Sequence, residues 1–147
     1  MINWLCKKFE DLSPYELYAI MQLRNEVFVV EQNCVFQDAD NKDQASYHLM
    51  GWKNDQLIAY TRLVPPEIVY KEASIGRVVT SPSLRGSGIG KELMERSIEK
   101  AKEFFKSNTI KIGAQLYLKK FYESLGFIQS SSIYLEDGIE HIEMILS

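Results

Sequence analysis

Hydrophobic residues recur along this chain with two periods, which divide it into helices and strands. From Pro14 to about Val30 they recur at helical spacing, so this segment is predicted to be a helix with one buried face. Ser13 before it is a typical N-cap, and Glu16 completes a capping box. A longer amphipathic helix is predicted from Ile89 to about Lys106, and a compact one from Leu116 to about Ser124.

Shorter apolar runs, rich in β-branched and aromatic residues, predict the strands. Asn54-Asp55 separates two of them as a two-residue hairpin turn, and Glu136-Asp137-Gly138 separates the last two. The order β-α-β-β-β-α-β-α-β-β predicts an α/β (or α+β) three-layer domain in which helices cover both faces of a mixed sheet. The predicted strands are residues 2–7, 47–53, 56–64, 73–80, 110–114, 127–134 and 139–146.

Composition limits what this chain does. Its 147 residues, 46% hydrophobic and 25% charged, suit a single domain over residues 1–147. A formal net charge of −3 argues against a general nucleic-acid binder, because such proteins rely on a basic surface. No apolar run approaches the roughly 18 residues of a membrane-spanning helix, so no membrane partner is expected. Cys6 and Cys34 lack metal-ligand spacing and are expected to be free, at least partly buried thiols; with no signal peptide, this predicts a cytoplasmic protein.

A polar loop, residues 31–43, follows the first helix and carries Asp38, Asp40 and Asp43. A calcium-binding EF-hand starting at Asp38 would need glycine at its sixth position and glutamate at its twelfth. Those positions hold Asp43 and Leu49, so an EF-hand is rejected and no metal site is expected. The acidic side chains are interpreted as a solvated loop, whose charge is compatible with a cationic amine ligand.

The most informative stretch is Arg85-Gly86-Ser87-Gly88-Ile89-Gly90, which opens the long helix. Glycines let a ligand approach the backbone closely, and the first N–H groups of a helix have no internal partner. Together with the positive end of the helix dipole, they form a site for a phosphate-like anion. A nucleotide P-loop would need glycine in place of Arg85, and a Rossmann loop would need it in place of Lys91, so both are rejected on spacing.

The loop resembles the (Q/R)-x-x-G-x-(G/A) loop of the GNAT N-acetyltransferases, whose amides bind the pyrophosphate of coenzyme A. The whole stretch 77–90 is similar to the family's motif A, including Pro82 three residues before the arginine. Residues 121–127, Phe-Tyr-Glu-Ser-Leu-Gly-Phe, are similar to its motif B, F-Y-x-x-x-G-F. Two separate motifs, each on the expected element, argue against a glycine-rich turn that binds nothing.

A closer resemblance, to the ElaA-type branch of the family, extends over essentially the whole chain. It is carried by residues 23–32, 51–53, 113–115 and 137–144. The resemblance implies the GNAT fold, with a mixed, mostly antiparallel sheet. One departure is Thr80, where the family usually has valine. Because the family's contact at this position is made through the backbone, binding of the coenzyme is expected to survive.

The family resemblance also implies roles for individual residues. The backbone of Val78, Val79 and Thr80 would pair with the pantetheine arm of acetyl-CoA. Tyr122 would act as the general acid that protonates the leaving thiolate, the alternative being a ring that only packs against the coenzyme. Gln115 lies near the position at which members of the family often have a cofactor-binding asparagine. The pyrophosphate would be held by the amides of Arg85, Gly86, Ser87, Gly88, Ile89, Gly90 and Lys91. The side chain of Arg85 either touches phosphate or stays in solvent.

The general base that deprotonates the amine stays open among Glu31, His48, His141 and Glu143, of which Glu31 and His141 are taken as the leading candidates. Histidine titrates near neutral pH, and a carboxylate acting through a water would serve equally well. Other polar residues beside apolar runs either line the acceptor pocket or form a buried ion pair between the first helix and the sheet. These are Glu31, Gln32, Arg62 and Arg77.

We therefore predict an acetyl-CoA-dependent N-acetyltransferase. It would move an acetyl or short acyl group to a small-molecule or peptide primary amine by direct attack, since neither cysteine sits in a nucleophile motif. The main alternative is a non-catalytic module that binds acyl-CoA, and a third is a small phosphate- or nucleotide-binding protein. Dimers are common in the family, so the resemblance is compatible with a homodimer.

Overall fold

The computed structural model describes residues 1–147, and its eight strands form one mixed sheet in the order β1-β2-β3-β4-β5-β8-β6, with β7 also paired to β8. All neighbours are antiparallel except β4 and β5, which are parallel. The predicted fold class is confirmed. The strands are β1 (Asn3–Lys8), β2 (Tyr47–Lys53), β3 (Gln56–Val64), β4 (Ala73–Thr80), β5 (Ile110–Gln115), β6 (Ile128–Gln129), β7 (Tyr134–Glu136) and β8 (Ile139–Leu146).

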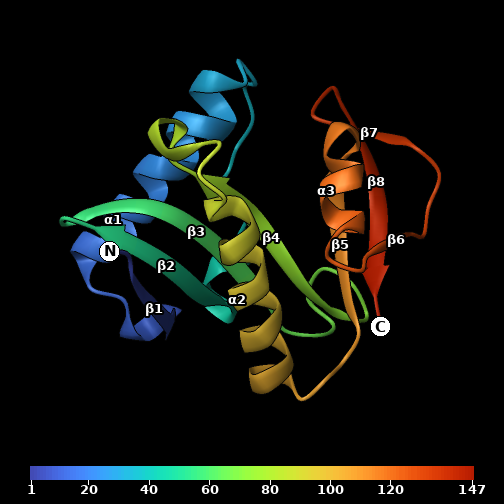
Figure 1. Ribbon diagram of the computed structural model, residues 1–147, viewed down its shortest axis with the longest axis horizontal. Coiled ribbons are helices and arrows are strands. Elements are labelled where there is room, and N and C mark those ends of the chain that lie inside the picture. The colour runs from blue at the N-terminus through green and yellow to red at the C-terminus, as the bar shows by residue number, and fades with distance from the viewer.

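Helices cover both faces of this sheet (Figure 1). They are α1 (Pro14–Arg24), α2 (Ile89–Phe105) and α3 (Lys119–Glu123). On one face α1 buries Ile20 and Leu23 against Met50 and Tyr60 of the sheet. On the other face, α2 and the residues around α3 pack on β2 to β5 and β8. None of the helices has the combined length and apolar character needed to cross a bilayer. Short 3-10 turns cover Phe9–Asp11, Asp43–Ala45, Pro82–Leu84 and Leu116–Leu118.

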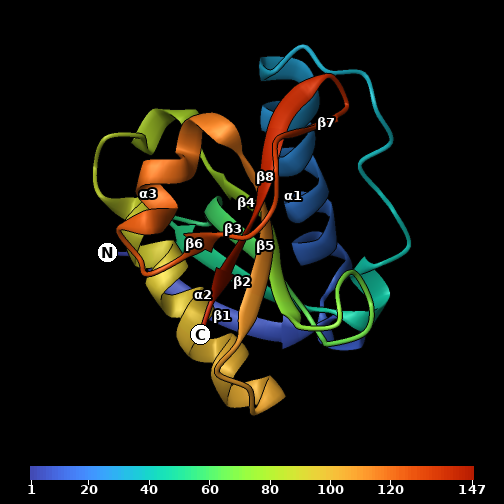
Figure 2. The same ribbon diagram turned by 90° about the vertical axis from the view of Figure 1, so that its right-hand side faces the viewer.

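The first helix begins as predicted and ends differently. The Ser13 hydroxyl accepts the Glu16 N–H at 3.0 Å and the Glu16 carboxylate accepts the Ser13 N–H at 2.8 Å, so the capping box is confirmed. After Arg24 the backbone widens into π-helical turns over Asn25–Glu31. Wide turns of this kind are frequent at functional sites. Here they lead directly into the long loop that runs beside α1 to the start of β2 (Figure 2).

The predicted strand 127–134 is wrong as a continuous element. It breaks into β6 and β7, with the serine-rich segment 130–133 between them. The hydroxyl of Ser131 accepts the N–H of Glu143 at 2.8 Å, where a strand would offer a backbone carbonyl. Serine side chains that bond to the backbone compete with sheet ladders in this way, which explains the break.

β4 and β5 stay paired at one end only. Their pairs are Ala73 with Ile110 and Ser74 with Lys111, and beyond them the two strands diverge (Figure 1). A bulge lies on β4 where they separate: Tyr60 faces Val79 and Arg62 faces Gly76, so Thr61 stands opposite both Arg77 and Val78. Arg77 takes a positive φ of 49° there. Because bulges bend a strand and increase its twist, this one turns β4 away from β5.

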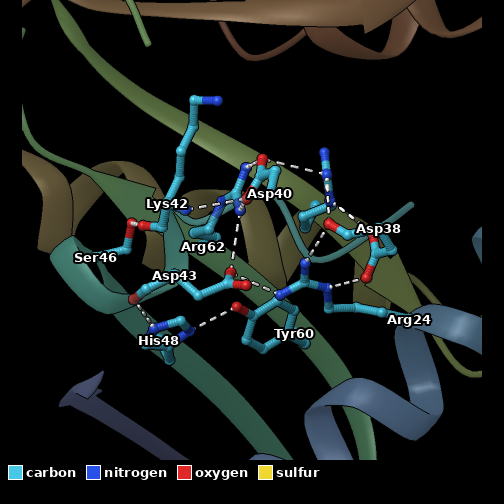
Figure 3. Close-up of polar contacts among 10 residues, drawn as sticks. Arg24, Asp38, Asp40, Lys42, Asp43, Ser46, His48, Tyr60 and Arg62 are labelled. Atoms are coloured by element: carbon cyan, nitrogen blue, oxygen red, sulfur yellow. Dashed lines mark hydrogen bonds and ion pairs between the residues drawn. The ribbon is translucent and has the colours of Figure 1, made fainter. Parts of the chain in front are cut away.

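Three arginines and three aspartates form a closed ring of alternating charge beside the bulge (Figure 3). Arg24 comes from α1, Arg62 from β3 and Arg77 from β4, while all three aspartates come from the loop after the π-helical turns. Around the ring the contacts are Arg24–Asp38 2.7 Å, Asp38–Arg77 2.7 Å, Arg77–Asp40 3.3 Å, Asp40–Arg62 2.7 Å, Arg62–Asp43 3.0 Å and Asp43–Arg24 2.8 Å. The Asp38–Arg77 contact is an ion pair without hydrogen-bond alignment. The ring fixes the loop to both α1 and the sheet.

The interpretation of this loop as solvated is therefore wrong. Asp38 is 7% exposed and Asp43 is 5% exposed, because their charges are neutralised by buried Arg24 and Arg62 and by half-buried Arg77. Burial by itself would raise the pKa of Asp43, but the hydrogen bond and charge of Arg24, with the charge of Arg62, hold it below its usual value. Of the residues expected in a buried ion pair between helix and sheet, Arg62 and Arg77 do form ion pairs, but with the aspartates of this loop, whereas Glu31 is bound to Arg85. Consequently these aspartates are not free to attract a cationic ligand.

We predict that Arg24→Met lowers the free energy of unfolding by about 3–5 kcal/mol, because the change leaves Asp38 and Asp43 buried without one of their cationic partners. Urea unfolding at pH 7 measures this loss. The matched control is Glu103→Gln, which removes an exposed pair with Lys100 and should cost less than about 0.5 kcal/mol. A loss below about 1 kcal/mol for Arg24→Met would show that the ring does not hold the loop.

Candidate active site

A cleft of about 900 Å³ opens where β4 and β5 diverge. One side of it is formed by the glycine loop, the start of α2 and the residues around α3. The other side is formed by the π-helical turns, the loop held by the charge ring and the β7–β8 hairpin. The sheet split therefore joins both faces of the molecule in one continuous space. Of the predicted site residues, those that line the cleft are Glu31, Val78, Val79, Thr80, Arg85, Gly90, Gln115, Tyr122 and His141.

The edge of β4 offers unpaired backbone to this cleft. From Ile75 to Thr80 no residue of β4 has a partner in β5, and Val78, Val79 and Thr80 all line the opening. The other edge of β4 is occupied by β3. An exposed strand edge binds extended ligands that carry amide groups, as an added strand would.

The glycine loop presents free amides next to this edge. Gly86 and Gly88 have φ of +82° and +83°, a conformation that favours glycine, and α2 begins directly after them. The first α2 hydrogen bond is from Glu92 N–H to the Gly88 carbonyl at 3.3 Å. The six preceding amides, on Gly86, Ser87, Gly88, Ile89, Gly90 and Lys91, donate to no acceptor within the protein. A run of unsatisfied amides at the positive end of a 17-residue helix is an anion site.

Arg85 and Glu31 are bound to each other across the cleft. The guanidinium donates two hydrogen bonds to the carboxylate, at 2.8 and 2.5 Å, and links the glycine loop to the π-helical turns. The hydrogen bond from Arg85 lowers the pKa of Glu31. Glu31 is consequently a weak base in this arrangement, and its carboxylate neutralises the charge that Arg85 would offer to phosphate.

Tyr122 comes from α3 and is 5% exposed, with its ring packed edge-on against Phe121 and Phe127. It lines the cleft, and its hydroxyl has no hydrogen-bond partner within the protein. Burial, followed by the charge of Tyr117, raises the pKa of Tyr122 to about 12. The phenol therefore stays protonated at neutral pH, which is the form that donates a proton.

His141 projects from β8 into the opposite part of the cleft and is 7% exposed. Its Nδ1 lies 2.8 Å from the Ile139 carbonyl oxygen, which can only accept a hydrogen bond. Nδ1 therefore carries the proton of the neutral ring, and Nε2 keeps a lone pair. The ring stacks on Tyr134 at 5.8 Å, which fixes its orientation. The lone pair of Nε2 is thus available as a base.

The other two base candidates lie outside the cleft. His48 is fully buried, with Nδ1 2.6 Å from the Tyr60 hydroxyl and Nε2 2.9 Å from the Asp43 carbonyl (Figure 3). Both nitrogens of the imidazole thus have partners next to the charge ring. Glu143 is paired with Lys111 at 3.0 Å and does not line the cleft. Both have structural partners that account for their positions.

Gln32 and Arg77, two of the polar residues expected either to line the acceptor pocket or to form an ion pair, line the cleft, whereas Arg62 does not. Gln32 meets the Gln115 side chain at 3.5 Å, a contact that joins the loop to the end of β5. Glu136 also lines the cleft and was not among the predicted site residues. The sequence could have identified it, because a two-residue turn at 137–138 places Glu136 on the same face of the hairpin as His141. Other cleft residues that were not predicted from the sequence include Phe28, Cys34, Phe36, Gln37, Tyr117 and Asp137. Cys6 and Cys34 are free and half-buried, as expected.

Comparisons of the sequence and of the structure with known proteins identify the same family. The family model described as "Acetyltransferase (GNAT) domain" matches residues 12–147. Protein ElaA of Escherichia coli K12 is 43% identical over 146 residues, which are 98% of this chain and 95% of that protein. A UPF0039 protein of Schizosaccharomyces pombe is 42% identical and covers 99% of this chain and 97% of its own.

Two solved structures match over the full length of both chains. The crystal structure of Escherichia coli ElaA has a TM-score of 0.94 at 42% identity. An acyl-CoA N-acyltransferase from Pseudomonas aeruginosa has a TM-score of 0.96, also at 42% identity. The predicted fold and the predicted resemblance to the ElaA branch are therefore confirmed.

Proposed function

This chain belongs to the GNAT acetyltransferase family, and from that premise we propose that it transfers an acetyl or other short acyl group from coenzyme A to a primary amine. The observation that carries the proposal is a loop with six unpaired amides that borders, through Arg85 and Gly90, a cleft lined by an open strand edge and by the protonated phenol of Tyr122. An enzyme that transfers an acyl group from coenzyme A would use each of them. The amides would bind the pyrophosphate, the strand edge would bind the extended pantetheine arm, and the phenol would donate a proton to the leaving thiolate.

The residues of the donor side fit coenzyme A. The amides of residues 86–91 would hold its pyrophosphate, since nothing in the protein competes for them. The free edge at Val78, Val79 and Thr80 would hold the amide-containing pantetheine arm. Gln115 borders the same channel. When bound, the thioester supplies an activated acyl carbon with a thiolate leaving group.

On the acceptor side, His141 would take one proton from the ammonium form of the substrate at Nε2. We favour His141 over Glu31, because Glu31 is held in a bidentate pair that weakens it as a base. The amine nitrogen then forms its bond to the acyl carbon while the carbon–sulfur bond breaks. Tyr122 gives its proton to the sulfur and is reprotonated by the proton that the acylated nitrogen releases, so charges and atoms balance. The apolar surroundings that keep the phenol protonated also raise the proton affinity of the leaving thiolate.

Transfer by direct attack is supported by the two cysteines. Burial raises the pKa of Cys6 to about 11, which keeps it a thiol, and it lies outside the cleft. Cys34 borders the cleft, and its Sγ donates to the Asp137 carbonyl at 3.4 Å. Neither has an adjacent base that would activate it as a nucleophile.

We expect Gly88→Val to weaken acetyl-CoA binding at least about ten-fold, because valine resists the positive φ that aims the loop amides. Isothermal calorimetry measures the affinity. Gly138→Val, at φ +79° in the β7–β8 turn, has the same backbone penalty away from the loop and serves as the control. Undiminished binding by Gly88→Val would remove the loop from the donor site.

Tyr122→Phe should lower kcat by about 10²–10⁴-fold, as expected for loss of a general acid, while the affinity for acetyl-CoA stays within a few fold. The variant breaks no hydrogen bond within the protein, because the lost hydroxyl has no partner there. Thiol release in the presence of amine gives kcat. Tyr117→Phe removes another cleft hydroxyl, one that is 75% exposed, and should leave kcat within about three-fold. Equal rates for wild type and Tyr122→Phe would exclude the tyrosine as the acid.

His141→Gln should lower kcat with saturating amine by at least about 10²-fold, because glutamine keeps the polarity and loses the basic lone pair. Glu31→Gln is the matched comparison and should have a smaller effect on kcat, since its carboxylate is bound to Arg85. The same thiol-release assay measures both variants. A larger loss in Glu31→Gln than in His141→Gln would assign the base to the carboxylate.

A further inference from the structure

Two hydrogen-bond acceptors face each other at the edge of the cleft. His141 Nε2 and Glu136 Oε2 are 3.7 Å apart, and with the proton of the neutral ring on Nδ1 neither atom can donate to the other. Both residues line the cleft. His141 is more than nine-tenths buried, yet Nε2 has no hydrogen-bond donor from the protein. When the ring is neutral, a group with N–H bonds and positive charge can satisfy both of these acceptors.

The charges around the cleft point to the same kind of group. Glu31, Asp40, Glu136 and Asp137 line it, against Arg77 and Arg85. Both arginines already have partners, in the ring and in the bidentate pair with Glu31. Glu136 and Asp137 contact no lysine or arginine. The part of the cleft next to the base therefore has uncompensated negative charge, which favours a cation and disfavours a second anion.

The hairpin holds this arrangement in place. Tyr134 pairs with His141 and Glu136 pairs with Ile139, so Glu136 and His141 project from the same face of β7–β8. Asp137 and Gly138 form the two-residue turn with φ of 52° and 79°. The Cys34 thiol binds the Asp137 carbonyl at 3.4 Å and ties this turn to the loop across the cleft. The Glu136 carboxylate therefore lies on a short hairpin whose turn is held by the loop across the cleft.

We infer that Glu136 binds the ammonium group of the acceptor and holds it against His141 Nε2, and that the site selects primary alkyl amines without a carboxylate beside the amino group. An ammonium group has three N–H bonds and satisfies both acceptors at once. An α-amino acid would bring its own carboxylate next to Glu136 and Asp137. This inference takes from the proposed function that an amine is the acyl acceptor, and it takes the position of the binding site from the geometry of the hairpin.

The test is a binding titration that needs no turnover. The chain has two histidines, so the ring signals of His141 are resolved by NMR, and those of buried His48 serve as an internal reference. Pentylamine and 2-aminohexanoic acid, which differ only by the carboxylate, are titrated into the wild-type protein and into Glu136→Gln. Glu136 has a 59% exposed side chain, so the variant should fold normally. Glu140→Gln, on the opposite face of the same hairpin, is the matched control.

We expect pentylamine to shift the His141 signals in the wild type with at least about ten-fold tighter binding than 2-aminohexanoic acid. Glu136→Gln should weaken the binding of pentylamine by at least about ten-fold, and Glu140→Gln by less than about two-fold. Failure of pentylamine to shift His141, equal binding of the two compounds, or an unchanged affinity in Glu136→Gln would each overturn the inference. Amine binding that depends on Glu136 without any acetyl transfer would overturn the proposed function and leave this site standing.

Discussion

The separation of β4 from β5 is the constraint on which the rest of the molecule depends. The two strands pair at Ala73 and Ser74 of β4 and nowhere else, so the parallel β4–β5 pair, which would otherwise bury both strand edges, opens into a cleft. The opening would expose backbone groups at no gain if nothing bound there. A bulge at Arg77, with a left-handed φ, turns β4 away from β5. Backbone strain of this kind persists only when the surroundings hold it in place.

The ring of arginines and aspartates provides that hold. Arg77 of the bulge is bound to Asp38 and Asp40, which Arg24 and Arg62 bind in turn. Buried ion pairs add little net stability over apolar packing, because desolvation of the charges offsets their attraction. Their value here is geometric, since each arginine comes from a different element and the aspartates all come from one loop. The ring fixes that loop as one wall of the cleft, and its arginines neutralise the aspartates of the loop. Glu136, which contacts no lysine or arginine, is then the unpaired carboxylate near His141.

Local patterns predicted local structure well. Ser13 and Glu16 specified the helix start, and the strands at 47–53, 56–64 and 73–80 have the predicted bounds. The glycine loop and Tyr122 were found because motifs with fixed spacing describe them. The ring was missed because its ion pairs join residues that are far apart along the chain. Arg24 and Arg62 are 14 to 22 residues from their aspartate partners, and Arg77 is farther still from its own. An aspartate has the same residue type in solvent and in a buried pair, so only the fold distinguishes them. The break at Ser131 depends on one hydroxyl replacing a backbone acceptor, which β-propensity does not encode.

The central claim is that the cleft brings an acyl-CoA and an amine together for reaction. The most direct test is release of free thiol from acetyl-CoA by the purified protein, followed with and without a panel of primary amines, with mass spectrometry of the amine products. We predict thiol release that requires both acetyl-CoA and an amine, with one N-acetylated amine formed for each thiol released. Binding of acetyl-CoA without amine-dependent release of thiol would contradict the claim and would identify the protein as an acyl-CoA-binding module.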